Sequence, residues 1–159
     1  MTSSVLVKPI QLIYLKMPVY NMNDFSVNFR VYYEDTDAGG IVYHSNYLKF
    51  CERARTEWLR AMGMSQNKML EDKEGFVIVN LSAHYKHSAK LDDMLKVTCA
   101  VSKLRKVAIY FSQQIFNEKN ELLFELECDV AFINMKTGLP KAMPSEAYQY
   151  AQGFLTQKS

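Results

Sequence analysis

The fold of this chain is decided by one stretch, residues Tyr32–Arg60, which reads YYEDTDAGGIVYHSNYLKFCERARTEWLR. The stretch passes from the end of an alternating strand pattern, through an acidic loop with two adjacent glycines, into a segment with helical spacing. It predicts a helix over about residues 46–62. Ser45 or Asn46 is positioned to cap the first turn of this helix, and Gly63 to end it.

The predicted helix has two different faces. Its apolar stripe is expected to enter the core, and its members recur at helical spacing: Tyr47, Cys51, Ala54, Trp58 and Ala61. On the remaining surface, Arg53 and Glu57 are four residues apart, and Glu52 and Arg55 are three apart. This spacing predicts ion pairs on an exposed face.

β patterns flank the helix on both sides. Apolar residues alternate over Phe25–Tyr33, and further strands are predicted over residues 76–87, 94–102, 107–116 and 122–132. A weaker helical segment is predicted over 65–73, and a short C-terminal helix from Pro144. The apolar run Phe76–Val79 is typical of a strand covered on both faces. The element order predicts an α+β fold with one antiparallel sheet and one long helix. Because that helix covers only one face, we expect an oligomer.

Composition narrows the class of protein. The chain has 159 residues, of which 48% are apolar and 23% charged, which suits one domain with a sizeable core. A net charge of +2 argues against nucleic-acid binding, and no apolar run approaches the ~20 residues of a membrane span. Cys51, Cys99 and Cys128 form no CxxC motif, so we expect buried thiols in a reducing compartment, the cytoplasm.

Residues 1–23 are interpreted separately from the domain predicted over residues 24–159. The segment has no basic start and no small-residue cleavage site, so it is a poor signal peptide. It is either a flexible extension or a start-site artefact, with translation beginning at Met17 or Met22.

The segment from Tyr33 to Tyr47 is the best candidate for chemistry. It carries acidic side chains into a glycine-bearing loop and then to a helix start, where unpaired N–H groups and the helix dipole favour a negatively charged oxygen. A carboxylate beside such donors can act as a base or a nucleophile on a polarised carbonyl. The alternative is an ordinary acidic turn that caps a helix.

Two segments of the chain resemble those of a known protein family. The stretch Tyr32–Arg60 resembles the signature of the 4-hydroxybenzoyl-CoA thioesterase family of hot-dog proteins, and more narrowly the bacterial Tol–Pal-associated acyl-CoA thioesterases. The segment YKHSAKLDDML, Tyr85–Leu95, is also similar to that family. The resemblance implies a curved antiparallel sheet wrapped around one long helix. It also implies a homodimer or homotetramer with active sites at the interface between protomers.

The resemblance also implies roles for particular residues. Asp37 corresponds to the catalytic carboxylate, acting as nucleophile or as general base. The backbone N–H of His44, seven residues later, corresponds to the oxyanion donor. Tyr43, Gly40 and Asn46 are candidate substrate-binding residues from the same segment. Because Ala38 stands where aryl-specific members carry proline, acyl rather than aryl thioesters are expected.

A basic cluster, Lys103, Arg105 and Lys106, is the candidate site for the phosphates of coenzyme A, with a solvated hairpin end as the alternative. His84 and His87 are three apart on a predicted strand and face opposite ways, so no metal site is expected. No cofactor is expected either, since coenzyme A is part of the substrate. The predicted function is an acyl-CoA thioesterase. An acyl-carrier-protein thioesterase and a largely non-catalytic scaffold in a cell-envelope or phospholipid-synthesis complex remain alternatives.

Overall fold

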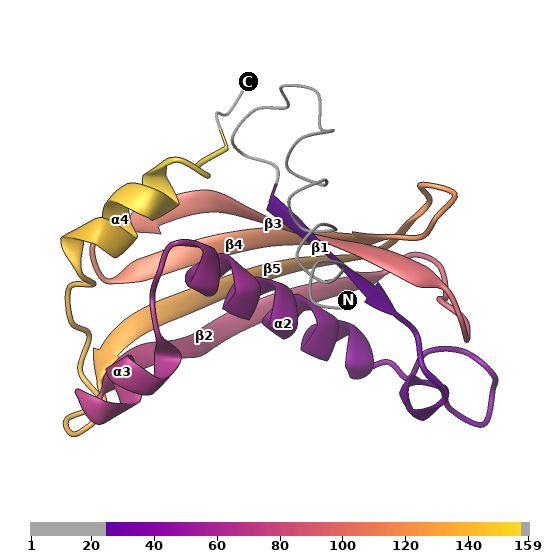
Figure 1. Ribbon diagram of the computed structural model, residues 1–159, viewed down its shortest axis with the longest axis horizontal. Helices are drawn as coiled ribbons and strands as arrows, with labels where there is room; N and C mark the ends of the chain where they lie inside the picture. The colour runs from indigo at the N-terminus through magenta and orange to yellow at the C-terminus, as the bar shows by residue number, and fades with distance from the viewer. Residues whose placement is uncertain (1–24, 157–159) are drawn as a thin grey trace, which may run out of the picture.

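Five antiparallel strands form one curved sheet in the order β1-β3-β4-β5-β2 (Figure 1). The computed structural model describes residues 25–156, so the predictions for residues 1–23 lie outside the described residues. The strands are β1 Phe25–Arg30, β2 Glu74–Tyr85, β3 Met94–Arg105, β4 Ala108–Phe116 and β5 Leu122–Asn134. Every strand predicted from alternation is present, and the predicted α+β architecture is confirmed.

The long helix α2, Asn46–Ala61, lies across the concave side of the sheet and packs on β3 and β1 (Figure 1). It ends where predicted, because Gly63 has a φ of 82°, in the left-handed region that glycine adopts at low cost. The other helices are a 3-10 turn η1 (Tyr33–Asp35), α3 (Gln66–Glu71) and α4 (Ser145–Gln152). Trp58, predicted to be a core residue, is fully buried and meets Phe111 edge-on at 5.2 Å between ring centroids.

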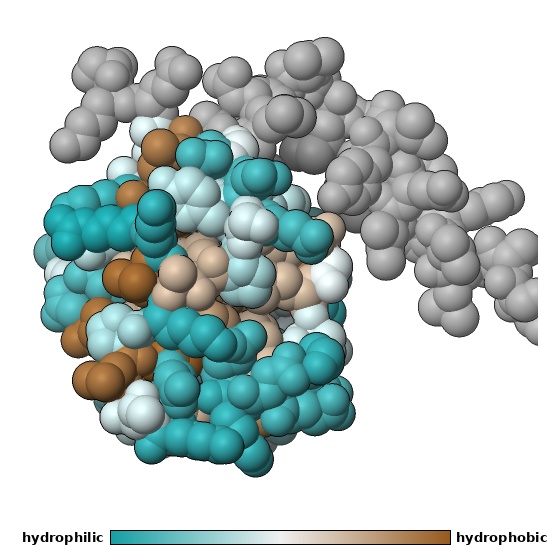
Figure 2. Space-filling view, turned by 90° about the vertical axis from the view of Figure 1, so that its left-hand side faces the viewer, coloured by the Kyte–Doolittle hydropathy of each residue, from teal (hydrophilic) through white to brown (hydrophobic). Residues whose placement is uncertain are grey.

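The core lies between α2 and the sheet. Alternate residues of β3, β4 and β5 are buried, and opposite partners such as Phe111 and Cys128 share a face. All three cysteines are free and buried, as predicted. Seen from the end that bears α3 and α4, the surface is mostly polar, with apolar groups in small separate patches (Figure 2). Within residues 25–156, no helix is both long and apolar enough to cross a membrane.

Two strand predictions need correction. The first strand ends at Arg30 rather than at Tyr33, because η1 turns the chain away from the sheet. The run Phe76–Val79 is not covered on both faces in the single chain. It belongs to β2, which is an edge strand, and Ile78 and Val79 are 50% and 62% exposed.

Candidate active site

The loop between β1 and α2 presents Asp37 at the corner of a tight turn. The carboxylate of Asp35 accepts a hydrogen bond from the Tyr32 N–H at 2.8 Å, which turns the chain out of the sheet. The Asp37 N–H then donates to the Ile41 carbonyl at 2.9 Å, and the Gly40 N–H donates to the Asp37 carbonyl at 3.0 Å. Gly40 has a φ of 77°, which a residue with a Cβ adopts only under strain.

One oxygen of the Asp37 carboxylate is held, and the other is available. Oδ1 accepts a hydrogen bond from the Gly39 N–H at 2.8 Å. A Cβ at Gly39 would lie only 3.1 Å from this oxygen, so the absence of a side chain there protects the geometry. Oδ2 accepts no hydrogen bond from the rest of residues 25–156, and the residue is exposed. A ligand therefore meets a carboxylate whose orientation is already set.

The first turn of α2 leaves backbone donors open. The Ser45 side chain makes no capping hydrogen bond, since Ser45 has helical backbone angles rather than the extended ones a cap requires. Asn46 instead donates its Nδ2–H to the Asp35 carbonyl at 2.9 Å. The prediction that one of these side chains caps the helix is wrong. Among the described residues, the His44 N–H has no acceptor, so the helix start can receive a negatively charged oxygen.

Residues Tyr85–Ala89, here called the arch, lead out of β2 and lie over this helix start. The Tyr85 hydroxyl donates to the His44 carbonyl at 2.8 Å. The Ala89 N–H donates to the Tyr47 hydroxyl oxygen at 3.0 Å, and the Val42 N–H donates to the Ala89 carbonyl at 2.9 Å. Burial raises the pKa of Tyr47 and of Tyr85, so both hydroxyls stay protonated at neutral pH. Both ends of the arch are thus anchored to the segment that carries the candidate chemistry.

A cavity of about 260 Å³ opens between the arch and the Asp37 loop. It brings together Asp37 and His44, the two predicted catalytic positions. The lining residues are Asp37, Ile41, Val42, His44, Tyr47, Tyr85, Lys86, His87 and Ser88. The predicted substrate-binding residues of this segment lie beside the cavity. Tyr43 is exposed and packs against the His44 ring at 4.4 Å, Gly40 shapes the turn, and Asn46 is buried behind it.

Seven of the nine lining residues were not predicted as site residues. Three come from the predicted segment, Ile41, Val42 and Tyr47, and four from the arch, Tyr85, Lys86, His87 and Ser88. The family-like segment Tyr85–Leu95 was the available signal, but nothing in its local pattern shows which part of the chain it meets. His87 was considered only as a metal ligand together with His84. Within residues 25–156, no group of three side chains is arranged to hold a metal ion.

The basic cluster lies away from the cavity that holds Asp37. Lys103, Arg105 and Lys106 are exposed at the turn between β3 and β4. The Lys103 Nζ and the Arg105 Cζ lie 5.1 Å and 5.9 Å from the centroid of the Tyr110 ring. Lys90, just before β3, pairs with Ile41 beside the Asp37 loop. The basic cluster lies at the other end of β3, roughly 30 Å further along the strand. A single chain therefore does not bring the cluster to the cavity.

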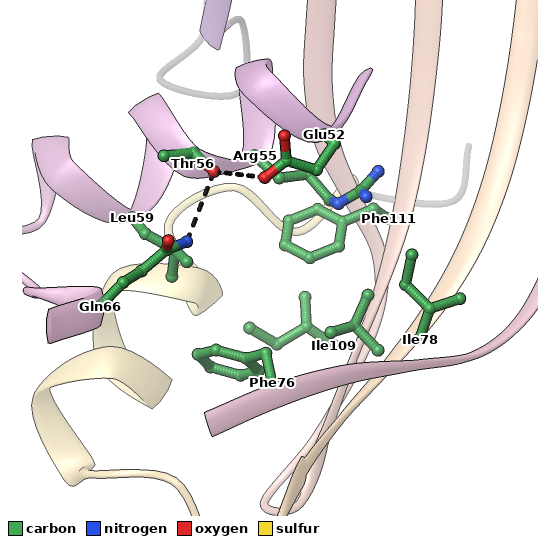
Figure 3. A pocket seen from close by; sticks show the side chains of 10 residues that line it. Glu52, Arg55, Thr56, Leu59, Gln66, Phe76, Ile78, Ile109 and Phe111 are labelled. Carbon is green, nitrogen blue, oxygen red and sulfur yellow. Dashed lines mark hydrogen bonds between the residues drawn. The ribbon is translucent and has the colours of Figure 1, made fainter. Parts of the chain in front are cut away.

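A second cavity, of about 170 Å³, lies between α2 and β2 (Figure 3). Its walls are mainly apolar and include Phe76, Ile78, Ile109 and Phe111, but Arg55 and Glu52 also line it.

The polar groups of this second cavity correct another prediction. Arg55 is buried and donates through Nη1 to Gln113 Oε1 at 2.8 Å, while Glu52 accepts from the Thr56 hydroxyl at 2.9 Å. The predicted ion pair between Glu52 and Arg55 is wrong, because Arg55 lies on the face of α2 that turns toward the sheet.

Comparison with known proteins identifies the family. Residues 31–151 match the family described as the thioesterase-like superfamily. The chain belongs to this superfamily. Acyl-CoA thioesterase YbgC from Haemophilus influenzae is 43% identical over 125 residues, which cover 78% of this chain and 91% of the relative. Acyl-CoA thioester hydrolase YbgC from Escherichia coli O6:H1 is 43% identical over 115 residues, covering 72% and 86%.

A solved structure supports the fold. A Staphylococcus aureus protein determined in complex with CoA superimposes with a TM-score of 0.78 at 16% sequence identity, over 90% of this chain and 93% of that one. The predicted hot-dog fold is confirmed, and the prediction of a thioester hydrolase is confirmed at the level of the family.

Proposed function

We propose that this protein hydrolyses acyl-CoA thioesters to a free acid and CoA in the cavity beneath the arch. The observation that carries the proposal is the pairing of two groups in one cavity. Asp37 offers a carboxylate with one free oxygen, and the start of α2 offers the unpaired His44 N–H. The relatives named YbgC, which are acyl-CoA thioester hydrolases, support the same reaction class.

The proposed chemistry uses only groups of the chain. The thioester carbonyl oxygen would lie on the His44 N–H, which stabilises the negative charge that develops on that oxygen. One such donor is worth about 10²–10³ in rate. Asp37 would then attack the carbonyl carbon or remove a proton from an attacking water. Because the donor is a backbone group, changes to the His44 side chain leave it in place.

Substitution of Asp37 by Asn tests the site. The amide oxygen of Asn can still accept from the Gly39 N–H, but it can serve neither as a base nor as an efficient nucleophile. We expect kcat to fall by about 10²–10⁴-fold, measured as thiol release from acyl-CoAs of graded chain length and from an aryl-CoA. Asp72→Asn, at an exposed carboxylate that caps the end of α3 and does not line the cavity, is the matched control. Wild-type turnover by Asp37→Asn would refute the site.

CoA is the proposed carrier, supported by the fold shared with the CoA-bound Staphylococcus aureus protein. The exposed cluster of Lys103, Arg105 and Lys106 favours acyl carrier protein as the second candidate, because a cationic surface suits an acidic protein. Turnover of both esters with and without added salt separates the two, since salt weakens a protein–protein encounter more than binding in a cavity. The three free thiols support a reducing, cytoplasmic setting.

A homodimer is the assembly we propose. The strand β2 is a sheet edge with exposed apolar residues, Ile78, Val79 and Leu81, and such an edge is a template for pairing with another chain. Pairing about a twofold axis would also bring residues of the partner toward each cavity. Lys103 and Arg105 lie far from the cavity of their own chain. In a dimer they would reach the cavity of the other protomer.

A further inference from the structure

Cleavage of a thioester releases a thiolate, and one group in the cavity can protonate it. This inference rests on the proposed function and extends it. His87 lines the same cavity as Asp37 and His44, although it is 50 residues away from Asp37 in the sequence. It belongs to the arch, a segment separate from the loop and from α2.

His87 is held between two anchors. On one side, the Tyr85 hydroxyl donates to the His44 carbonyl at 2.8 Å. On the other, the Ala89 N–H donates to the Tyr47 hydroxyl at 3.0 Å. The His87 N–H itself donates to the Leu123 carbonyl at 3.1 Å. These bonds fix the backbone of the arch relative to the helix start, so His87 lines the cavity from a supported position.

The other charged groups around the cavity are less suited to this task. Lys86 has its Nζ 3.6 Å from a carboxylate oxygen of Glu125 on β5. The His44 ring is packed against Tyr43, beside the backbone donor proposed for the carbonyl oxygen. Asp37 faces the carbonyl carbon as base or nucleophile. The Tyr85 hydroxyl donates its proton to the His44 carbonyl. Burial raises the pKa of the Tyr47 hydroxyl, which makes it a poor proton donor.

We propose that His87 is a catalytic residue that donates a proton to the sulfur of the departing CoA thiolate. An imidazolium is ordinarily a stronger acid than an alkyl thiol, so transfer of its proton to a thiolate is downhill. When the C–S bond breaks, its electron pair goes to sulfur, and the proton of His87 forms the S–H bond. Neutral His87 then recovers a proton, either from Asp37, if Asp37 took one from the attacking water, or from the water that opens an acyl-aspartate. Atoms and charge balance on both routes.

Two thioesters with one acyl group and different leaving groups test the proposal. Acyl-CoA releases an alkyl thiolate, which benefits from a proton, whereas an S-aryl ester releases a far less basic thiolate that needs none. We expect His87→Gln to lower kcat for acyl-CoA by about 10²-fold and to leave the S-aryl ester at the wild-type rate. Free imidazole should restore part of the acyl-CoA rate in His87→Ala.

His84→Gln is the matched control, because His84, on β2, pairs with Glu125 of β5 and does not line the cavity. An equal loss for both esters would make His87 a merely structural residue and overturn the proposal. Unchanged rates for both esters in His87→Gln would also overturn it. So would a loss confined to acyl-CoA that appears in His44→Gln rather than in His87→Gln. Failure of the proposed function is distinguishable, since wild-type protein would then cleave neither ester. Asp37→Asn should lose activity toward both esters, whether or not His87 donates a proton.

Discussion

At the residue scale, the buried thiols couple stability to pH. Burial raises the pKa of Cys51 to about 12 from an ordinary 9.0, and it raises the pKa of Cys128 as well. Above pH 9 the unfolded chain loses the Cys51 proton while the folded chain keeps it. The unfolded state then binds fewer protons, so the free energy of unfolding falls as pH rises toward 12.

Cys51→Ala should weaken this dependence. Between about pH 9 and pH 11, we expect the variant to lose about 1.4 kcal/mol less per pH unit than the wild type, because one such thiol no longer contributes. Urea unfolding at several pH values, with reductant present, measures both slopes. Equal slopes for the two proteins would contradict the assignment, whatever the variant's stability at neutral pH.

At the element scale, a buried polar contact joins α2 to the sheet. Arg55 donates to Gln113 Oε1, and the Gln113 amide donates to the carbonyls of Cys51 on α2 and Thr98 on β3, at 3.1 Å and 3.2 Å. Gln113 is fully buried, so its side-chain oxygen has no access to water. The contact therefore sets how α2 is rotated and where it sits along β4 and β3.

Arg55→Met should leave the Gln113 oxygen buried without a donor. Such a group costs about 1–3 kcal/mol, and we expect the free energy of unfolding to fall by that amount. Arg53→Met is the matched control, because Arg53 is exposed on the same helix, with its Cζ 5.8 Å from the centroid of the Phe50 ring. Chemical denaturation gives both values. An equal, small change in the two variants would show that the Gln113 contact contributes nothing.

At the scale of the whole molecule, the exposed β2 edge is the surface we propose for the dimer interface. Val79 sits at an irregularity in the pairing of β2 with β5, and it is 62% exposed in the single chain. Val79→Lys should place a charge in the proposed interface and shift the protein toward monomers, with loss of activity if the site needs both protomers. Light scattering after gel filtration measures the mass. Leu139→Lys, at a similarly exposed position outside β2, should leave the mass unchanged.

Much of this protein is determined by local sequence. Alternation and helical spacing predicted the strands, α2 and the glycine that ends it, because these patterns reflect which neighbours along the chain face the same side. The stretch Tyr32–Arg60 also identified the family, and with it Asp37 and His44 as the candidate catalytic positions.

Only the tertiary structure decided the rest. It brought the arch over the start of α2, which adds Tyr85 and His87 to the cavity, and it left β2 as an exposed edge. It turned Arg55 toward Gln113 rather than Glu52, and it separated Lys103 from the cavity by most of a strand. The physical reason is the same in each case. Local patterns specify which way a residue faces on its own element, whereas its partner depends on how distant elements pack.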